Sequence, residues 1–254
     1  MKAIEVLIVT INKTRDEVIK LIRSMNIQTS AIVCNQNGDW RCEKISLNNG
    51  EVIKCLYFNE KGVGLNRNNG LMRACSEYIV FADDDMIFYN NYAETIKKAF
   101  EDVPDADILI FNLDGLGGGA KNTKINRIRL FNCLKYGAPR MVAKLDKIKQ
   151  SGILFNLCFG GGAEYCHGED TLFLVDCIKK NLKIYSYPKS IATLVDIRKS
   201  TWNSGYDLKY MHDQGVLYKQ ISRKFWKLLC LQDAIRHRSK YKKSWIVSYK
   251  EMLS

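Results

Sequence analysis

The sequence predicts an α/β fold in which a mainly parallel sheet is covered by helices. Two observations carry this prediction: short apolar runs alternate with amphipathic segments of helical period through the first half of the chain, and turn-forming residues separate them. With 254 residues, 46% of them hydrophobic, the chain can bury one large core and carry a short appendage. We expect a main domain at residues 1–218 and a basic helical extension at residues 219–254.

The expected elements follow one another in a regular order. Residues 6–10, Val-Leu-Ile-Val-Thr, form an apolar run typical of a strand that is buried on both faces. Thr14 and Glu17 have the spacing of a capping box, and apolar residues recur after them with a helical period, which predicts an amphipathic helix. Further strands are expected at residues 31–34, 52–58, 78–81, 108–112 and 183–186, and further helices at residues 65–75, 92–100 and 169–180.

The composition narrows the class of protein. No run approaches the roughly 18 apolar residues of a membrane-spanning helix, and Glu5 interrupts any signal-like N-terminal segment. Nine cysteines are scattered without a CxxC pair, so we expect reduced, structural thiols in a cytoplasmic protein. None of the three histidines has finger-like spacing from cysteines, and zinc is not expected. The net charge of +12 indicates an acidic partner, such as a nucleotide, a nucleic acid or an anionic membrane.

An aspartate triplet is the strongest local signal in the chain. Asp83, Asp84 and Asp85 come directly after an apolar run, and neighbouring carboxylates repel one another unless a cation lies between them. Since alternate residues of a strand point to the same side, Asp83 and Asp85 can share a face at the sheet edge where α/β folds bind ligands. Together with diphosphate oxygens, two carboxylates suit Mg²⁺ or Mn²⁺. A solvated acidic turn is the alternative.

Two segments of the chain resemble the nucleotide-sugar half of family 2 glycosyltransferases. They are residues 64–70, Gly-Leu-Asn-Arg-Asn-Asn-Gly, and residues 76–85, Ser-Glu-Tyr-Ile-Val-Phe-Ala-Asp-Asp-Asp. The resemblance covers roughly residues 4–215 and implies the GT-A fold of nucleotide-diphospho-sugar transferases. It also implies a UDP-sugar donor and a glycan or lipid-linked glycan acceptor, as in the synthesis of bacterial surface polysaccharides such as capsules.

The resemblance assigns the aspartate triplet to the DxD motif of the family. It implies that Asp85 is the main metal ligand and that Asp83 lies near the ribose or shares the metal. Asp84 belongs to the same nucleotide-binding segment. The implied cofactor is Mn²⁺ or Mg²⁺.

Other residues are assigned to the nucleotide by the same resemblance. Thr10, near the end of the first strand, and Asp39, after the second, match positions that contact the nucleoside. The turn at residues 35–39 is longer and richer in amides than the common acidic version, so Gln36 is an alternative to Asp39. Arg67 matches the arginine of the family's Arg-Asn pair, which lies beside the nucleotide; an ordinary surface cation is the alternative.

The second half of the chain contains a candidate catalytic base. Residues 160–164, Gly-Gly-Gly-Ala-Glu, and residues 168–171, Gly-Glu-Asp-Thr, resemble the family's acceptor-side loop and Glu-Asp motif. A helix N-terminus stabilises negative charge, so a carboxylate there stays ionised and can accept the proton of an attacking hydroxyl. We assign Asp170 as the base of a single displacement with inversion, and Glu169 as an acid that orients the acceptor. The alternative is that both residues only cap the helix.

Residues 201–202 and 205–215 resemble the end of the family's catalytic domain. Such regions often supply a further metal or diphosphate contact, and His212 and Asp213 are the obvious ligand types there. We predict His212 as an additional metal ligand. Trp202 is a candidate for stacking on a sugar or for packing in the core.

The extension at residues 219–254 is rich in basic residues and aromatics. Apolar residues at positions 221, 225, 228 and 229 follow helical spacing beside Arg223, Lys224 and Lys227, which predicts a basic amphipathic helix. Such a helix can make peripheral contact with the inner face of a cell membrane, or it can pack on the main domain. The two interpretations are compatible.

Two other functions compete with this interpretation. A sugar-nucleotide nucleotidyltransferase would show a glycine- and lysine-rich loop after the first strand, but residues 10–14, Thr-Ile-Asn-Lys-Thr, contain no glycine. A non-enzymatic nucleic-acid-binding protein would account for the charge of +12. It would leave the aspartate triplet and the Glu-Asp pair unexplained, because carboxylates repel phosphate, and we do not expect nucleic acid as a partner.

Overall fold

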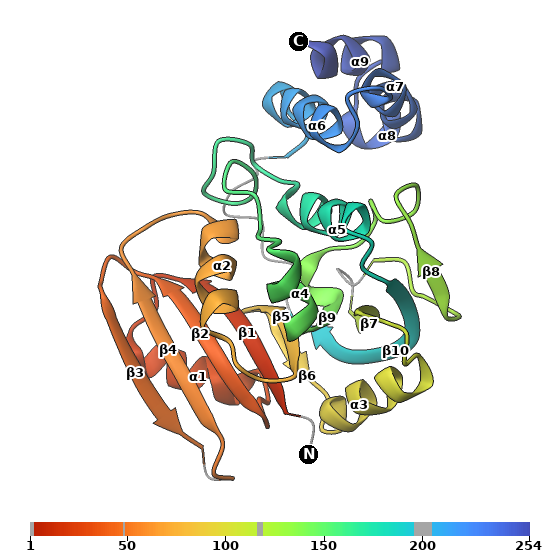
Figure 1. Ribbon diagram of the computed structural model, residues 1–254. Helices are drawn as coiled ribbons and strands as arrows, with labels where there is room; N and C mark the ends of the chain where they lie inside the picture. Colours follow the sequence, from red (N-terminus) through yellow and green to blue (C-terminus); the bar gives the residue numbers. More distant parts are fainter. Residues whose placement is uncertain (1–2, 48, 116–118, 196–204) are drawn as a thin grey trace.

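One sheet runs through the protein, with helices on both faces and a further group of helices at one end (Figure 1). The computed structural model describes residues 3–47, 49–115, 119–195 and 205–254. Among these residues, every strand and helix predicted for the main domain is present.

The strands are β1 (Ile4–Ile11), β2 (Ser30–Gln36), β3 (Arg41–Ser46), β4 (Val52–Phe58), β5 (Tyr78–Asp83), β6 (Met86–Phe88), β7 (Ile108–Asp114), β8 (Asn126–Ile128), β9 (Met141–Lys144) and β10 (Ile184–Leu194). The helices are α1 (Arg15–Ser24), α2 (Val63–Arg73), α3 (Tyr92–Asp102), α4 (Leu145–Ser151), α5 (Glu169–Lys179), α6 (Leu208–Ile221), α7 (Trp226–Arg236), α8 (Arg238–Tyr241) and α9 (Trp245–Leu253). A short 3₁₀ turn, η1 (Ala138–Arg140), precedes β9.

The sheet order is β3-β4-β2-β1-β5-β9-β7-β10-β6, with β8 paired to β10. The strands β4, β2, β1 and β5 are parallel to one another, as predicted, so their carboxyl ends meet at one edge. The other half is mixed, because β9 lies antiparallel between β5 and β7, whereas β7 and β10 are parallel. The α/β fold class is therefore confirmed, with its parallel part concentrated in the first half.

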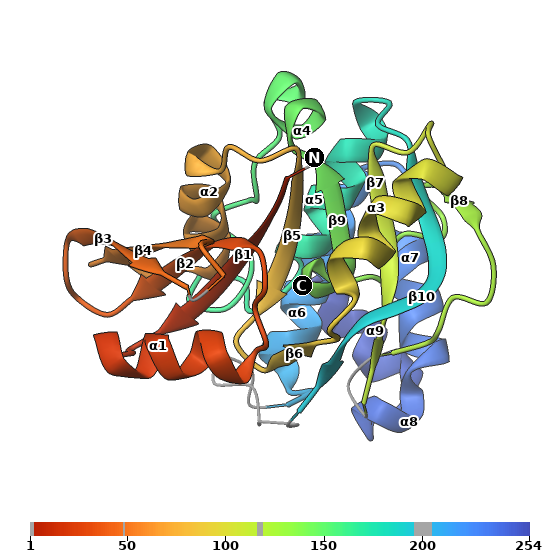
Figure 2. The ribbon, with the colours of Figure 1, turned by 90° about the horizontal axis from the view of Figure 1, so that it is seen from below.

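Each face of the sheet carries its own hydrophobic cluster. On β1, Val6 and Ile8 belong to the cluster that packs α1 and α3, whereas Leu7 and Val9 belong to the cluster that packs α4 and α5. This alternation is the two-residue period of a strand buried on both sides. Figure 2 shows α1 and α2 on opposite sides of the sheet.

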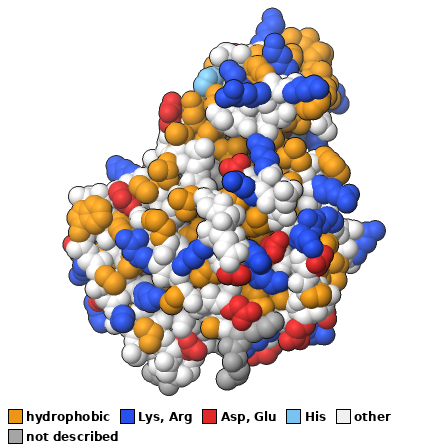
Figure 3. Space-filling view, viewed as in Figure 1, with side chains coloured by type: hydrophobic (Ala, Val, Ile, Leu, Met, Phe, Trp, Pro, Cys, Tyr) orange, Lys and Arg blue, Asp and Glu red, His pale blue; other side chains and the backbone are white. Residues whose placement is uncertain are grey.

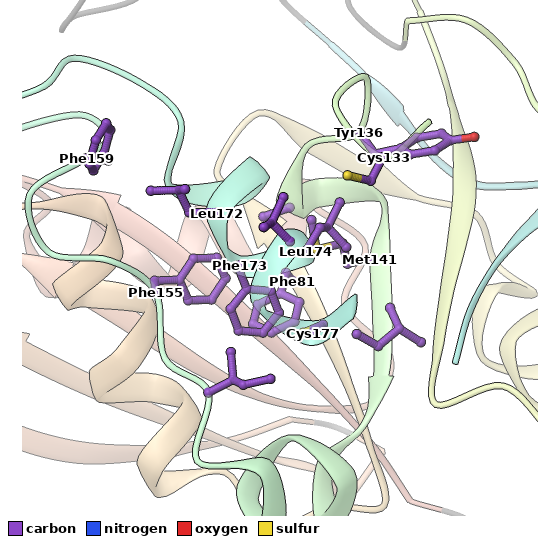
Figure 4. Packing of buried hydrophobic residues seen from close by; sticks show 14 of the residues in the cluster. Phe81, Cys133, Tyr136, Met141, Phe155, Phe159, Leu172, Phe173, Leu174 and Cys177 are labelled. Atoms are coloured by element: carbon purple, nitrogen blue, oxygen red, sulfur yellow. The ribbon is translucent and has the colours of Figure 1, made fainter. Parts of the chain in front are cut away.

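Three phenylalanines join the strand before the aspartate triplet to the helix that begins with the Glu-Asp pair. Phe173 of α5 stacks on Phe155 with ring centroids 4.2 Å apart, and Phe81 of β5 meets both rings edge-on at 5.7 and 5.4 Å (Figure 4). These buried contacts fix α5 relative to β5. The two acidic segments are therefore held by a shared core.

Helices α6 to α9 form a unit that we call the helical cap, residues 208–253. In it α6 packs against both α7 and α9, and Gly215 of α6 lies so close to Met252 that an added Cβ would be 1.8 Å from the Met252 carbonyl oxygen. The boundary expected between residues 218 and 219 falls inside α6. The helical unit of the structure begins earlier, at Leu208.

The helical period read across residues 221–232 does not correspond to one continuous helix. The chain leaves α6 at Ser222, which has an extended backbone, and its hydroxyl oxygen accepts a hydrogen bond from the Phe225 N–H at 3.2 Å before α7 begins. Serine favours such turns because its hydroxyl competes for backbone hydrogen bonds. Among the described helices, none combines the length and apolar character needed to cross a bilayer.

Candidate active site

The aspartate triplet lies at the carboxyl edge of the parallel strands. Asp84 Oδ2 accepts a hydrogen bond from Thr10 Oγ1 at 2.6 Å and lies 3.3 Å from Lys13 Nζ. Asp83 instead pairs with Arg67, with Oδ1 2.9 Å from Nη2. Adjacent carboxylates therefore have partners on different elements, Asp83 at the end of β5 and Asp84 in the turn that follows it. Thr10 thus contacts the triplet itself, and Lys13 is a neighbour of the site that the sequence did not single out.

Arg67 links the triplet to the Glu-Asp pair at the start of α5. Its side chain is only 3% exposed, and besides Asp83 it pairs through Nη1 with Glu169 Oε1 and Asp170 Oδ1, both at 2.8 Å. Burial acts to lower the pKa of this guanidinium, but the three carboxylates raise it above its ordinary value. A buried cation with this many partners keeps its charge. Arg67 therefore connects the two acidic segments. Its predicted position beside the nucleotide stays a prediction.

Buried asparagines hold α2, and with it Arg67, against the strand ends. Asn66 Nδ2 donates to the carbonyl oxygens of Cys34 at 2.9 Å and Thr10 at 3.4 Å. Asn68 makes two hydrogen bonds with the Phe155 backbone, at 2.9 and 2.8 Å. Hydrogen bonds from buried amides to backbone groups fix a helix more specifically than apolar contacts do. The amide-rich run that carries the family resemblance has this structural role here.

Asp170 is held from two sides at the N-terminus of α5. One oxygen pairs with Arg67, and Oδ2 accepts a hydrogen bond from the Ala138 N–H at 2.9 Å. Burial and then the neighbouring Glu169 carboxylate raise the pKa of Asp170 to about 7, against the opposite effects of Arg67 and the Ala138 N–H. The helix N-terminus alone predicted a carboxylate that stays ionised. A carboxyl that titrates near neutral pH is better matched to proton transfer.

A glycine makes room for the other member of the acid pair. Gly160 has a φ of 101°, and a Cβ there would lie 2.6 Å from Glu169 Oε2. The resemblance assigns this glycine cluster to the family's acceptor-side loop. In the structure, Gly160 leaves room for the Glu169 carboxylate beside Arg67.

The acid pair opens onto a large cleft between the main domain and the helical cap. The cleft has a volume of about 1290 Å³ and is lined by Glu169 and Asp170, by residues 130–137, and by α6, α7 and α8. Typical small-molecule sites occupy about 300–1,000 Å³. The cleft therefore has room for more than a single sugar at the acid pair.

Helix α6 fixes the segment that precedes the acid pair. The buried Asp213 carboxylate accepts a hydrogen bond from the Cys166 N–H at 2.9 Å and pairs with Lys209 at 2.6 Å. His167 Nε2 lies 2.6 Å from Gln214 Oε1, and its ring stacks on Tyr210 with centroids 4.3 Å apart. The position of Asp170 therefore depends on the helical cap.

Cys166, His167 and Asp213 also bring three potential metal-ligand atoms within 4.8 Å of one another. Asp213 is already paired with Lys209 at 2.6 Å, and His167 lies 2.6 Å from Gln214. Because these contacts hold the segment before α5 against α6, we assign the cluster this structural role.

The remaining predicted residues lie outside the group formed by the aspartate triplet, Arg67 and the acid pair. Gln36 is buried and its Nε2 donates to the Gly62 carbonyl oxygen at 3.1 Å, so it fixes the turn before α2. Asp39 is exposed between β2 and β3, 3.2 Å from Arg41, which leaves it the more accessible of the two for a nucleoside. His212 lies on α6 with Nδ1 3.5 Å from Asp213 Oδ1, and its part in metal binding stays a prediction. Trp202 lies outside the described residues.

The end of β5 has a donor set that fits a hard divalent cation. Asp83 and Asp85 are both partly exposed, and one oxygen of Asp85, Oδ1, is itself buried. Carboxylate oxygens are the ligands that Mg²⁺ and Mn²⁺ prefer. Asp83 ends β5 and Asp85 lies in the turn that follows, so the expectation that the two share a face by strand alternation does not apply, but both carboxylates stand at the same edge of the sheet.

These features define a class of enzyme. A parallel sheet whose carboxyl edge bears an acidic triplet, linked by a buried arginine to a carboxylate pair in a cleft, is the arrangement of a GT-A nucleotide-sugar transferase. Residues 6–158 match the family model "Glycosyl transferase family 2". The chain belongs to this family and is a glycosyltransferase.

Solved structures agree on the fold. The crystal structure of S. aureus TarS 1-349 in complex with UDP-GlcNAc is similar with a TM-score of 0.63 and 16% identity, over 93% of this chain and 73% of that one. The complex of TarS 1-349 with UDP gives 0.61 and 17%, over 93% and 72%, and the longer TarS structure gives 0.61 and 16%, over 93% and 44%. At such identity the likeness shows the GT-A fold alone. No curated protein matches the chain in sequence.

Proposed function

We propose that this enzyme moves one sugar from a UDP-sugar to a hydroxyl of a glycan or lipid-linked glycan, with inversion at the anomeric carbon. The observation that carries the proposal is the contact of one guanidinium, that of Arg67, with both Asp83 and Asp170. A donor bound at the triplet would thereby have its reacting carbon within reach of a base. TarS 1-349 forms a complex with UDP-GlcNAc, which supports a UDP-sugar as the donor here.

Asp170 would act as the general base. As the acceptor oxygen forms its bond to the anomeric carbon, its proton passes to the Asp170 carboxylate, and the bond to the diphosphate breaks with its electron pair on the leaving oxygen. Glu169, beside Arg67, would orient the acceptor. Asp85 and Asp83, with His212 as a further candidate, would hold Mn²⁺ or Mg²⁺, which stabilises the charge of the departing diphosphate.

Thr10, Arg67 and the accessible Asp39 would face the nucleotide side of the same site. Asp84 supports this side indirectly, since its carboxylate fixes Thr10 and Lys13. Gln36 would act only through the turn that it fixes.

We also propose peripheral contact with the inner face of a cell membrane, through residues 219–254. Figure 3 shows basic side chains gathered over the helical cap, with apolar side chains beside them. Arg223, Lys224 and Lys227 are exposed near the exposed Phe225 and Leu228. Basic and apolar groups on one surface are the combination that anionic bilayers attract.

A panel of UDP- and GDP-sugars tests the proposal. Nucleotide release and thermal stabilisation would be followed with Mn²⁺ and with EDTA. We expect a UDP-sugar to stabilise the protein only with the metal, and Asp85→Ala to abolish that stabilisation. Asp170→Asn should keep donor binding and lose transfer by about 10²- to 10⁴-fold. Full transfer by Asp170→Asn would refute the base, and donor binding indifferent to EDTA would refute the metal site.

A further inference from the structure

We infer that a second pocket, beside β8, binds a negatively charged group of the acceptor glycan. The group would be a carboxylate or a phosphate on a sugar unit that follows the reacting one. This inference deepens the proposed transfer and rests on it, because it makes the charged group part of the acceptor. The lining of the pocket does not include Arg67 or the aspartate triplet, so the pocket is separate from the side proposed for the donor.

The pocket is lined by cations and, in the described part of the chain, by no aspartate or glutamate. It has a volume of about 390 Å³ and lies where β8 pairs with β10 (Figure 1). Its four cations are Lys121, Arg127, Arg129 and Lys135. Like charges that line one pocket repel one another, and an anion between them relieves this repulsion. The lining therefore suits an anionic ligand.

Three of the four cations have no carboxylate partner. Lys121 Nζ pairs with Asp114 Oδ1 at 2.6 Å, which neutralises its charge. The others, Arg127, Arg129 and Lys135, make no ion pair with any acid that the structure describes. An anion entering the pocket would therefore meet three uncompensated cations.

The Arg127 side chain is held in place without being neutralised. Its guanidinium lies over the Tyr185 ring, 4.9 Å from the ring centroid. Asp105, an acid that Arg127 affects electrostatically, forms its own ion pair with Lys183 at 2.7 Å. A guanidinium stacked on an aromatic ring keeps its N–H donors available for a carboxylate or a phosphate.

Hydrogen bonds within the protein hold the walls of the pocket. The Ser186 hydroxyl accepts from the Asn126 N–H at 3.1 Å and donates to the Lys124 carbonyl oxygen at 3.0 Å. The Tyr136 hydroxyl donates to Asn122 Oδ1 at 2.9 Å. Because these contacts need no ligand, the pocket is preformed, and a preformed site loses less conformational entropy on binding.

A buried cation lies behind the pocket. Arg140 is only 5% exposed. Its guanidinium donates to neutral oxygens of Phe111, Asn112 and Ala120, at 2.8, 3.1 and 3.1 Å. It lies 5.0 Å from the centroid of the Tyr136 ring, which lines the pocket. No acid in the described chain pairs with Arg140, and burying a charge without an opposite charge is unfavourable. Arg140 therefore adds to the preference of the pocket for negative charge.

The pocket adjoins the cleft that contains the acid pair. Three residues, Asn132, Lys135 and Tyr136, line both the pocket and the cleft. Tyr136 is two residues from Ala138, whose N–H donates to Asp170 Oδ2 at 2.9 Å. Two residues span at most about 7 Å of chain. A glycan whose reacting end lies at Asp170 could therefore place a following unit in the pocket.

Sulfate binding tests the pocket without any sugar. Thermal unfolding would be followed in sodium sulfate and in sodium chloride of equal ionic strength. We expect sulfate to stabilise the parent protein more than chloride does. Arg127→Gln with Arg129→Gln should weaken sulfate binding at least about tenfold, and Lys135→Gln, at an exposed position, should weaken it as well.

A matched pair of variants separates binding from the general effect of sulfate on stability. Lys20→Gln with Arg23→Gln removes two exposed cations of α1 outside the pocket and should leave sulfate binding unchanged. The same loss in the α1 variant, or no loss in any pocket variant, would overturn the site.

Acidic sugars test the glycan part of the inference by calorimetry. Trigalacturonate is compared with its methyl ester, and glucose 6-phosphate with glucose, so each neutral partner keeps its sugar rings and loses the charge. We expect at least one acidic sugar to bind at least about tenfold more tightly than its neutral partner and than sulfate, and Arg127→Gln with Arg129→Gln to remove this advantage. The tighter of the two identifies the group as a carboxylate or a phosphate.

Two results would contradict the glycan part. Equal affinity of both acidic sugars and their neutral partners would overturn a charged acceptor group. Affinity of both no higher than that of sulfate would leave only a site for simple ions.

The proposed function fails separately. If no UDP-sugar stabilises the protein with Mn²⁺, the transfer proposal falls even if acidic sugars bind beside β8. If transfer occurs, but Arg127→Gln with Arg129→Gln leaves the KM for the acceptor unchanged, only the inference falls.

Discussion

The two sides of the active site are built in different ways. The donor side stands on four parallel strands whose ends meet at one edge, so Thr10 and Asp84 become neighbours through backbone geometry alone. The acceptor side is assembled from a loop, the start of α5 and the helical cap, which no sheet holds together. The difference shows that the side proposed for the donor is formed by a fixed strand edge, whereas the side proposed for the acceptor depends on side-chain contacts between segments far apart in sequence. Arg67 joins the two sides.

Replacing the connector should have the largest effect. Arg67→Met leaves three carboxylates without their cation, and we expect the free energy of unfolding to fall by about 3–5 kcal/mol. Urea unfolding at pH 7.5 measures this change. Arg23→Met, which removes an exposed arginine of α1, is the control and should stay within about 0.5 kcal/mol of the parent protein. A loss no larger than that of the control would mean that the two sides are not coupled through Arg67.

Destabilising the helical cap should affect acceptor binding without affecting donor binding. Gly215→Val places a side chain against the Met252 backbone, and we expect a loss of about 1–3 kcal/mol, weaker acceptor binding and unchanged stabilisation by a UDP-sugar. Thermal unfolding with and without donor, and the KM for the acceptor, measure these effects. Gln220→Ala, at an exposed position of α6, is the control. If donor binding falls together with acceptor binding, the sides are less independent than the fold indicates.

The acceptor side should also carry a stability cost that depends on pH. Because the folded protein raises the pKa of Asp170 to about 7, it binds that proton more tightly than the unfolded chain does. The stability of the parent protein should therefore fall, relative to Asp170→Asn, as the pH rises from about 4 to about 7. We expect the variant to be more stable by about 1–2 kcal/mol at pH 8 and equal at pH 4. An equal gain at both pH values in urea unfolding would contradict the raised pKa.

Removing the cap of α1, whose side-chain contacts do not include the site residues, should have the smallest effect. Thr14 caps α1, with its hydroxyl accepting from the Glu17 N–H and the Glu17 carboxylate accepting from the Thr14 N–H. Thr14→Ala should cost about 1 kcal/mol and leave donor and acceptor binding unchanged. Ser239→Ala, at an exposed position, should cost nothing measurable in the same unfolding experiment. Altered binding by Thr14→Ala would show that α1 contributes to the site.

The difference between the strand edge and the side assembled from distant segments also explains which parts the sequence could predict. Strands β1, β2, β4 and β5, the capping box of α1 and the aspartate triplet were readable, because apolar runs and turn residues mark strand ends locally. The edge strand β3 was missed, since its exposed, charged residues lack an apolar run. The antiparallel insertion of β9 was missed as well, because strands that pair across a long stretch of sequence leave no local pattern.

Within the site, residue types were more predictable than their contacts. Asp83, Asp170 and Arg67 were singled out, but nothing in a linear sequence indicates that one guanidinium contacts acids of both segments. Lys13 and Tyr210 were missed, and Asp213 was noted only as a potential ligand, because lone polar residues in loops or helices carry no distinguishing period. The contacts of Tyr210 and Asp213 exist only once the cap is folded against the domain, whereas Lys13 meets Asp84 within the main domain.

The attachment of His167 and Cys166 to α6 has a mechanical consequence. These two residues immediately precede the glycine that starts α5, so a shift of α6 draws the Asp170 carboxylate with it and alters its distance from Arg67. A substrate that moves the cap away from the main domain would therefore change the pKa of Asp170. By reciprocity, a ligand bound at the donor pocket would change how stably the cap packs on the main domain. If the two substrates bind as proposed, their affinities would be coupled through two hydrogen bonds made by α6, a helix that contacts neither reacting bond.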